Sequence, residues 1–92
     1  VQVRLFPETD TDIVRKLVDE INETHVSEFP EITVYPDVLF VSNSKNQLML
    51  RVSMYVKAGS QFGIENKFYE MYVNKIVDAG IDLPYGDIDF EK

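Results

Sequence analysis

The chain has 92 residues, enough for one domain built around a single hydrophobic core. Its 9 basic and 16 acidic residues give a formal net charge of −7, which argues against binding nucleic acid or an anionic membrane surface. The apolar share of 45% is typical of a folded domain, and the absence of cysteine excludes disulfides, thiol catalysis and cysteine-ligated metals.

The first third of the chain predicts a strand followed by a helix. Residues 1–6 alternate between apolar and polar side chains, and Pro7 ends this strand. Thr9 and Asp12 are spaced as a capping box at the start of a helix over 11–24, which the polar stretch 22–25 ends. Apolar residues at helical spacing form its buried face: Ile13, Val14, Leu17, Val18 and Ile21.

Two further strands are predicted on either side of a turn over 42–46, where all residues are turn formers. The first, 33–41, is rich in β-branched and aromatic residues, but Pro36 requires a break, a bulge or an edge position. The second, 47–57, is predicted to be a strand because its side chains alternate. Its length and its hairpin partner suggest a central antiparallel position. Its inward residues are Leu48, Leu50, Val52, Met54 and Val56, and its outward residues are Met49, Arg51, Ser53 and Tyr55.

A second helix over 63–79 and a last strand over 87–91 complete the pattern. The helix has an apolar stripe at every fourth position, Ile64, Phe68, Tyr72 and Ile76, widened by Tyr69, Val73 and Val77. Gly80 is expected to be the C′ glycine of a Schellman motif in which Ile81 contacts Ile76. Residues 87–91 alternate between acidic and apolar side chains.

The order β-α-β-β-α-β predicts a single α+β domain over 1–92 with the ferredoxin-like sandwich fold. In this fold a four-stranded antiparallel sheet carries two helices on one face. The fold hosts many activities, so function depends on particular residues. The chain does not begin with methionine, so we expect it to be a fragment of a longer protein.

Several residues that could carry chemistry are better explained by structure. Glu8, Asp10 and Asp12 resemble the start of a calcium loop, but Ile13 stands where that loop needs glycine. We expect these acids to complement the positive end of a helix dipole, at the helix N-terminus. The single histidine, His25, is expected to complement the negative end, at a helix C-terminus. Asp87, Asp89 and Glu91 are expected to form a solvated face.

No catalytic residue, no cofactor site and no metal site is predicted, and we expect the domain not to be an enzyme. The serines lack the G-x-S-x-G arrangement of a nucleophile elbow, and the glycines are too isolated for a phosphate-binding loop. No nucleic acid partner is expected either, because the outward residues of 47–57 do not form the basic, aromatic signature of an RNA-binding sheet.

Several short motifs, in the same order, resemble the cytoplasmic domain of the small-conductance mechanosensitive (MscS-like) ion channel family. Residues 78–85, DAGIDLPY, resemble the closing motif EAGIEIPFP of that family and match it at Ala79, Gly80, Ile81 and Pro84. Residues 7–14 (PETDTDIV), 30–34 (PEITV) and 48–56 (LMLRVSMYV) resemble the motifs YxTDxDxV, PxVxV and LxLRVxxWV. Gly86 and Asp87 depart from the family, which has proline and glutamine there.

The resemblance implies a domain on the cytoplasmic side of a channel in the cell membrane. Subunits of that family form a homo-oligomer, a heptamer, whose vestibule filters solutes, and inorganic ions pass the parent channel. Contact with the membrane would be made only by transmembrane parts outside this chain. Acidic residues could line the gaps between subunits and favour cations: Glu8, Asp10, Asp12, Asp82, Asp87, Asp89 and Glu91.

Two alternatives share the predicted fold. A regulatory or dimerisation domain of a cation-efflux transporter usually carries several histidine and aspartate ligands, and this chain has one histidine. An enzyme of the acylphosphatase type needs an arginine in a glycine-rich loop after the first strand, and residues 7–10 carry the wrong charge for binding phosphate there.

Overall fold

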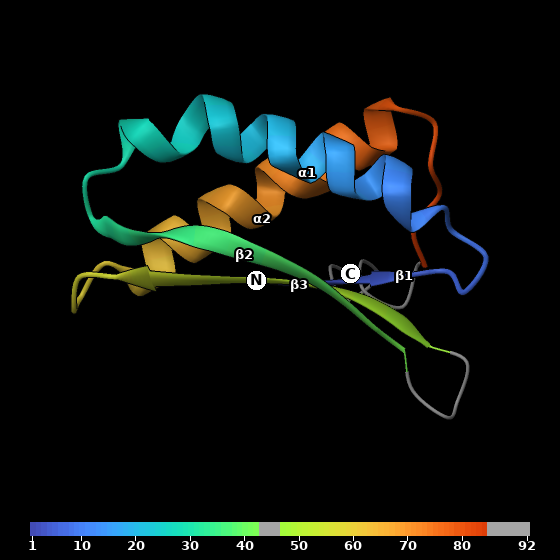
Figure 1. Ribbon diagram of the computed structural model, residues 1–92, viewed down its shortest axis with the longest axis horizontal. Helices are drawn as coiled ribbons and strands as arrows, with labels where there is room; N and C mark the ends of the chain where they lie inside the picture. The colour runs from blue at the N-terminus through green and yellow to red at the C-terminus, as the bar shows by residue number, and fades with distance from the viewer. Residues whose placement is uncertain (43–46, 85–92) are drawn as a thin grey trace, which may run out of the picture.

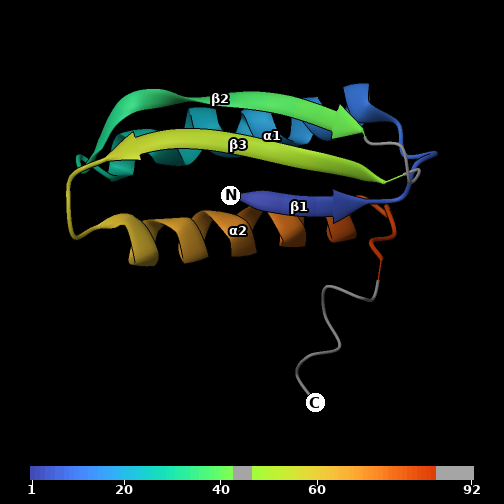
Figure 2. The ribbon, with the colours of Figure 1, turned by 90° about the horizontal axis from the view of Figure 1, so that it is seen from below.

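The computed structural model describes residues 1–42 and 47–84, which form an α+β sandwich (Figure 1). Three antiparallel strands pair in the order β1-β3-β2, and both helices cover one face of this sheet (Figure 2). The elements are β1 (Gln2–Leu5), α1 (Thr11–His25), the short 3₁₀ helix η1 (Val26–Glu28), β2 (Ile32–Ser42), β3 (Leu48–Val56) and α2 (Gln61–Asp78). The α+β class is therefore confirmed, whereas the strand predicted over 87–91 lies outside the described residues.

The core lies between the sheet and the helices, where the predicted inward faces meet. Leu48, Leu50 and Val52 of β3 are buried, and Met54 and Val56 are partly buried against the same cluster, so the predicted register is confirmed. The stripe of α2 is also confirmed, since its buried residues are Ile64, Phe68, Tyr72 and Ile76. Phe68 packs edge-on against Phe29 with their ring centroids 5.3 Å apart.

Two apolar residues assigned to helix faces lie outside the core. Ile13 of α1 and Val77 of α2 are about half exposed, at 48% and 52%. Both stand at the border of their helical stripes, where burial depends on the neighbouring element and not on spacing alone. The predicted faces are therefore too wide by one residue on each helix.

Asn22 is buried in the helix layer, although the sequence places it in a polar helix end. It lies on α1 four residues after Val18, on the side that faces α2. The hydroxyl of Tyr72 donates a hydrogen bond to Asn22 Oδ1 over 2.5 Å, and both side chains are buried. The helix ends at His25 as the polar stretch 22–25 predicts, but Asn22 itself is buried, and its amide oxygen has a partner inside the protein.

The N-cap of α1 is Asp10 and not Thr9. The Asp10 carboxylate accepts hydrogen bonds from the backbone N–H groups of Asp12 (3.0 Å) and Ile13 (3.4 Å). Asp10 has the extended backbone of an N-cap, and its carboxylate satisfies donors that the first turn leaves free. Thr9 belongs to the preceding turn, where its N–H donates to the carbonyl oxygen of Phe6.

Strand β2 forms one edge of the sheet, and Pro36 lies within it. The register between β2 and β3 shifts between Ile32 and Val34 and again between Val34 and Asp37. Both expectations for Pro36, an edge position and an irregular register, are met. Arg15 of α1 reaches over this edge: its Nη1 donates to the carbonyl oxygen of Val38, and its guanidinium lies 5.1 Å from the centre of the Phe40 ring.

The end of α2 is the predicted Schellman motif. Gly80 has a φ of 85°, its N–H donates to the carbonyl oxygen of Val77, and the N–H of Ile81 donates to that of Ile76. These are the two bonds that define the motif. The left-handed backbone requires glycine here, because a Cβ atom is unfavourable at this φ.

Replacing Gly80 with alanine should lower the free energy of unfolding by about 1 kcal/mol, because alanine is strained in the left-handed region. Gly63 offers a control of opposite sign. It lies inside α2, where an added Cβ meets no atom within 4 Å, so Gly63→Ala should stabilise the protein by about 0.5–1 kcal/mol. Urea unfolding of both variants measures the two changes in the free energy of unfolding. Equal effects would mean that the helix does not end at Gly80.

Candidate functional site

The outer face of the sheet is the broadest candidate for an interaction surface, because both helices cover the opposite face (Figure 1). Three large apolar side chains on β2 and β3 are exposed here: Val34, Leu39 and Tyr55, the last at 68%. Val34 lies opposite Tyr55 and Leu39 lies opposite Arg51 in the strand register. The clustering of aromatic, aliphatic and arginine side chains is typical of protein–protein contact surfaces.

The charge on this outer face differs from that of the chain as a whole. Arg4 and Arg51 stand on its outward positions, and Asp37, opposite Ser53, is the only carboxylate among the outward positions of the described strands. The other acids of the described residues, 1–42 and 47–84, lie in the helices and connections. A partner for the sheet face would be apolar at its centre and acidic around it.

Three of the acids singled out in the sequence meet at one corner of the molecule. Glu8 and Asp10, from the connection between β1 and α1, and Asp82, beyond α2, line a shallow pocket of about 260 Å³. The carboxylate of Asp10 is occupied as the N-cap of α1. Asp12 lies in the first turn of that helix. Asp87, Asp89 and Glu91 lie outside the described residues.

The described residues, 1–42 and 47–84, hold no group of three or more His, Cys, Asp or Glu side chains arranged to bind a metal ion. His25 lies at the end of α1 as expected, with its Nδ1 atom 2.9 Å from Glu28 Oε1.

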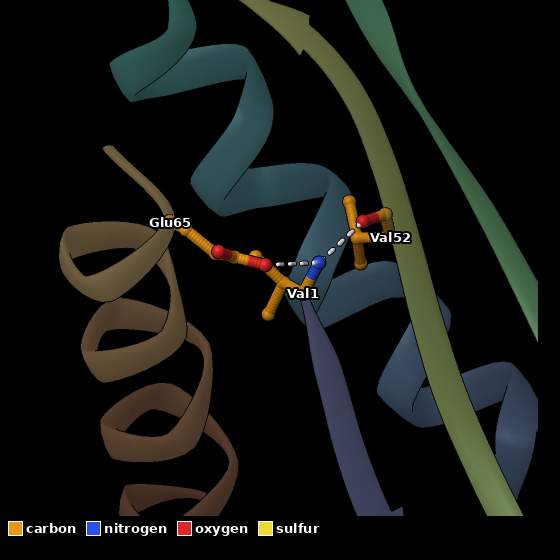
Figure 3. A network of polar contacts seen from close by, with 3 residues as sticks. All are labelled: Val1, Val52 and Glu65. Atoms are coloured by element: carbon orange, nitrogen blue, oxygen red, sulfur yellow. Dashed lines mark hydrogen bonds and ion pairs between the residues drawn. The ribbon is translucent and has the colours of Figure 1, made fainter. Parts of the chain in front are cut away.

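A groove lies at the start of β1, between β3 and α2. It has a volume of about 640 Å³, and its walls include residues from Arg51 to Val56 on one side and Gln61, Ile64 and Glu65 on the other. The amino nitrogen of Val1 lies at one end, 2.9 Å from the carbonyl oxygen of Val52 and 3.7 Å from Glu65 Oε2 (Figure 3). Sequence reasoning missed this groove, because its walls come from β3 and α2 and depend on how these two elements pack.

Comparisons with protein-family models, curated proteins and solved structures found no match to this chain. In the described part of the chain, neither helix combines the length and the apolar character needed to cross a membrane.

Proposed function

We propose that this chain is a non-enzymatic cytoplasmic domain of a mechanosensitive ion channel, contributing to subunit assembly and to the vestibule wall. The observation that carries the proposal is the order of the family-like motifs together with their places in the fold. Residues 7–14 form the connection from β1 into α1, 48–56 coincide with β3 (Leu48–Val56), and 79–84 contain the Schellman end of α2. Motifs that keep the family's order along the chain support the resemblance more than isolated short matches do.

We further propose that residues 87–91 add a fourth strand beside β1 and complete the ferredoxin-like sandwich. Among the described residues β1 pairs only with β3, so its other edge can accept a strand. The alternation of 87–91 would place Ile88 and Phe90 on the side of the buried residues Val3 and Leu5. The carboxylates would then point toward the outer face, where Arg4 stands.

The outer sheet face supports the assembly role. A ring such as the heptamer of the family uses two different surfaces of each subunit, one meeting the other on the next subunit. The part of the outer face formed by β2 and β3, around Leu39 and Tyr55, carries Arg51 and one outward carboxylate, Asp37, so it suits contact with an apolar surface of a neighbouring copy. In this proposal the parent protein lies in the cell membrane, conducts inorganic ions and needs no cofactor in this domain.

The test is made on the full-length parent protein, reconstituted in giant vesicles and studied by patch clamp under suction. We expect discrete conductance steps that appear with membrane tension, and a particle in detergent whose mass corresponds to seven subunits. A dimeric parent that moves metal cations in response to an ion gradient, and shows no tension-dependent steps, would replace the channel with the transporter alternative.

A further inference from the structure

The outer face of β2 and β3 is organised in rows, each made of two outward residues that lie opposite one another in the strand register. Side chains of opposed residues stand on the same side of a sheet, and successive rows are two residues apart along β3. In order along the strands, the rows are Val41 with Met49, Leu39 with Arg51, Asp37 with Ser53, and Val34 with Tyr55. The first and fourth rows are apolar, whereas the second carries a cation and the third an anion.

The two charged side chains of these rows, Arg51 and Asp37, are both exposed. Within the ranges 1–42 and 47–84, neither side chain is joined to another residue by an ion pair or a hydrogen bond. Both helices cover the opposite face of the sheet, so they do not shield these charges (Figure 1). The cation and the anion are therefore available to a molecule that approaches the outer face.

The order of the rows is self-complementary. A two-fold axis that lies in the plane of contact, runs across the strands and passes between the second and third rows reverses the row order in a second copy. The first row of each copy then meets the fourth row of the other, apolar against apolar, and the Arg51 row meets the Asp37 row. Because a two-fold contact repeats itself, the pairing of Arg51 with Asp37 occurs twice.

The spacing of packed sheets suits this arrangement. Two sheets that pack face to face lie about 10 Å apart with nearly aligned strands. Arg51 would then stand over Ser53 of the second copy, with Asp37 of that copy one strand to the side, an offset that a long arginine side chain can span. The exposed side chains of Leu39 and Tyr55 would fill the space between the sheets and lose their contact with water.

We propose that the outer face formed by β2 and β3 pairs with the same face of a second copy of this chain across a two-fold axis, with Arg51 of each copy against Asp37 of the other. The pair is closed, because each copy uses this face completely and a third copy cannot add to it. The proposal goes beyond the channel function and does not depend on it. A ring contact through the same face would compete with the pair.

The test measures the dimer dissociation constant of the full chain by sedimentation equilibrium, with charge reversals at the two positions. Arg51→Glu sets acid against acid and Asp37→Arg sets cation against cation, so each should raise the dissociation constant at least tenfold. An equimolar mixture of the two variants should pair with a dissociation constant within about threefold of the original, because both contacts of the mixed dimer join opposite charges. All substituted side chains are exposed, so each variant should keep the circular dichroism spectrum of the original.

Two comparisons separate this contact from general repulsion between acidic copies. Lys67→Glu changes the net charge as much as Arg51→Glu does, but Lys67 is exposed on α2, in the helix layer. It should change the dissociation constant less than about twofold, because salt screens charges that are far from the contact. Asp37→Arg adds two positive charges to a chain of net charge −7, so general repulsion predicts tighter pairing where the proposal predicts weaker pairing.

The proposal is overturned if the full chain stays monomeric up to about 1 mM, which would leave the face to a different partner. A mixture of the two variants that associates no better than each variant alone would equally rule it out, as would a Lys67→Glu effect as large as that of Arg51→Glu. The patch-clamp test of the parent protein has a separate outcome. Tension-dependent steps together with a monomeric chain would overturn the pair and retain the channel.

Discussion

Replacing Phe68 with alanine should lower the free energy of unfolding by about 3–5 kcal/mol. Phe68 is fully buried at the centre of the core, with its ring between Phe29 and Tyr72 at centroid distances of 5.3 and 5.9 Å. The truncation removes the transfer free energy of a ring and leaves a cavity that the flanking rings can fill only in part. Urea unfolding followed by circular dichroism gives the loss.

Phe62 provides the matched control, since it is a phenylalanine of the same helix with 75% of its surface exposed. Phe62→Ala should change the free energy of unfolding by no more than about 0.5 kcal/mol. If the two substitutions had similar effects, the stripe of α2 that faces the sheet would not be the one described above.

Replacing Tyr72 with phenylalanine should cost about 1–3 kcal/mol, because it leaves Asn22 Oδ1 buried without its donor. Asn22 Nδ2 is buried and already lacks a hydrogen-bond partner, so the loss of the phenol leaves the whole amide unpaired. Removing both polar groups, in the double variant Asn22→Leu with Tyr72→Phe, should recover most of that loss. A double variant no more stable than Tyr72→Phe alone would show that the hydrogen bond is not what the single substitution removes.

The same tyrosine makes stability depend on alkaline pH. Burial raises the pKa of Tyr72 above the ordinary value of about 10, and this outweighs the opposing effect of its hydrogen bond to Asn22. The unfolded chain ionises as the pH rises through about 10 while the folded protein keeps the phenol neutral, so the contribution of Tyr72 is complete below pH 10 and is lost above it. Unfolding measured between about pH 9 and 11 should show a shallower decline for Tyr72→Phe than for the original chain.

Much of the fold could be predicted because its determinants are local. Alternation along β3 fixed which residues face the helices, and the stripe of α2 followed directly from fourfold spacing. Gly80 could be recognised because few residues other than glycine adopt the positive φ that this helix end requires. Asn22 was misplaced because its chemical type was given more weight than its position: it stands four residues after the buried Val18, and spacing alone would have put it on the inner face.

The features relevant to a site were less accessible from the sequence. The outward residues of β3 follow from alternation, but their proximity to Leu39 depends on strand pairing across a turn. The meeting of Glu8 with Asp82 requires the two helices to be packed, since these residues are far apart along the chain. The groove beside Val1 is lined by residues of both β3 and α2, and no local pattern encodes how these two elements pack.

The reach of Arg15 over β2 has a consequence for uncontrolled growth of the sheet. A fibre forms when every molecule offers two open strand edges, one for each neighbour. On the β2 side the Arg15 guanidinium already donates a hydrogen bond to the carbonyl oxygen of Val38, and Pro36 has no N–H to donate. The row of free backbone N–H and C=O groups that a neighbouring strand would need is therefore interrupted. Association through strand edges is then limited to the opposite side of the sheet, and it ends after a single pairing instead of propagating.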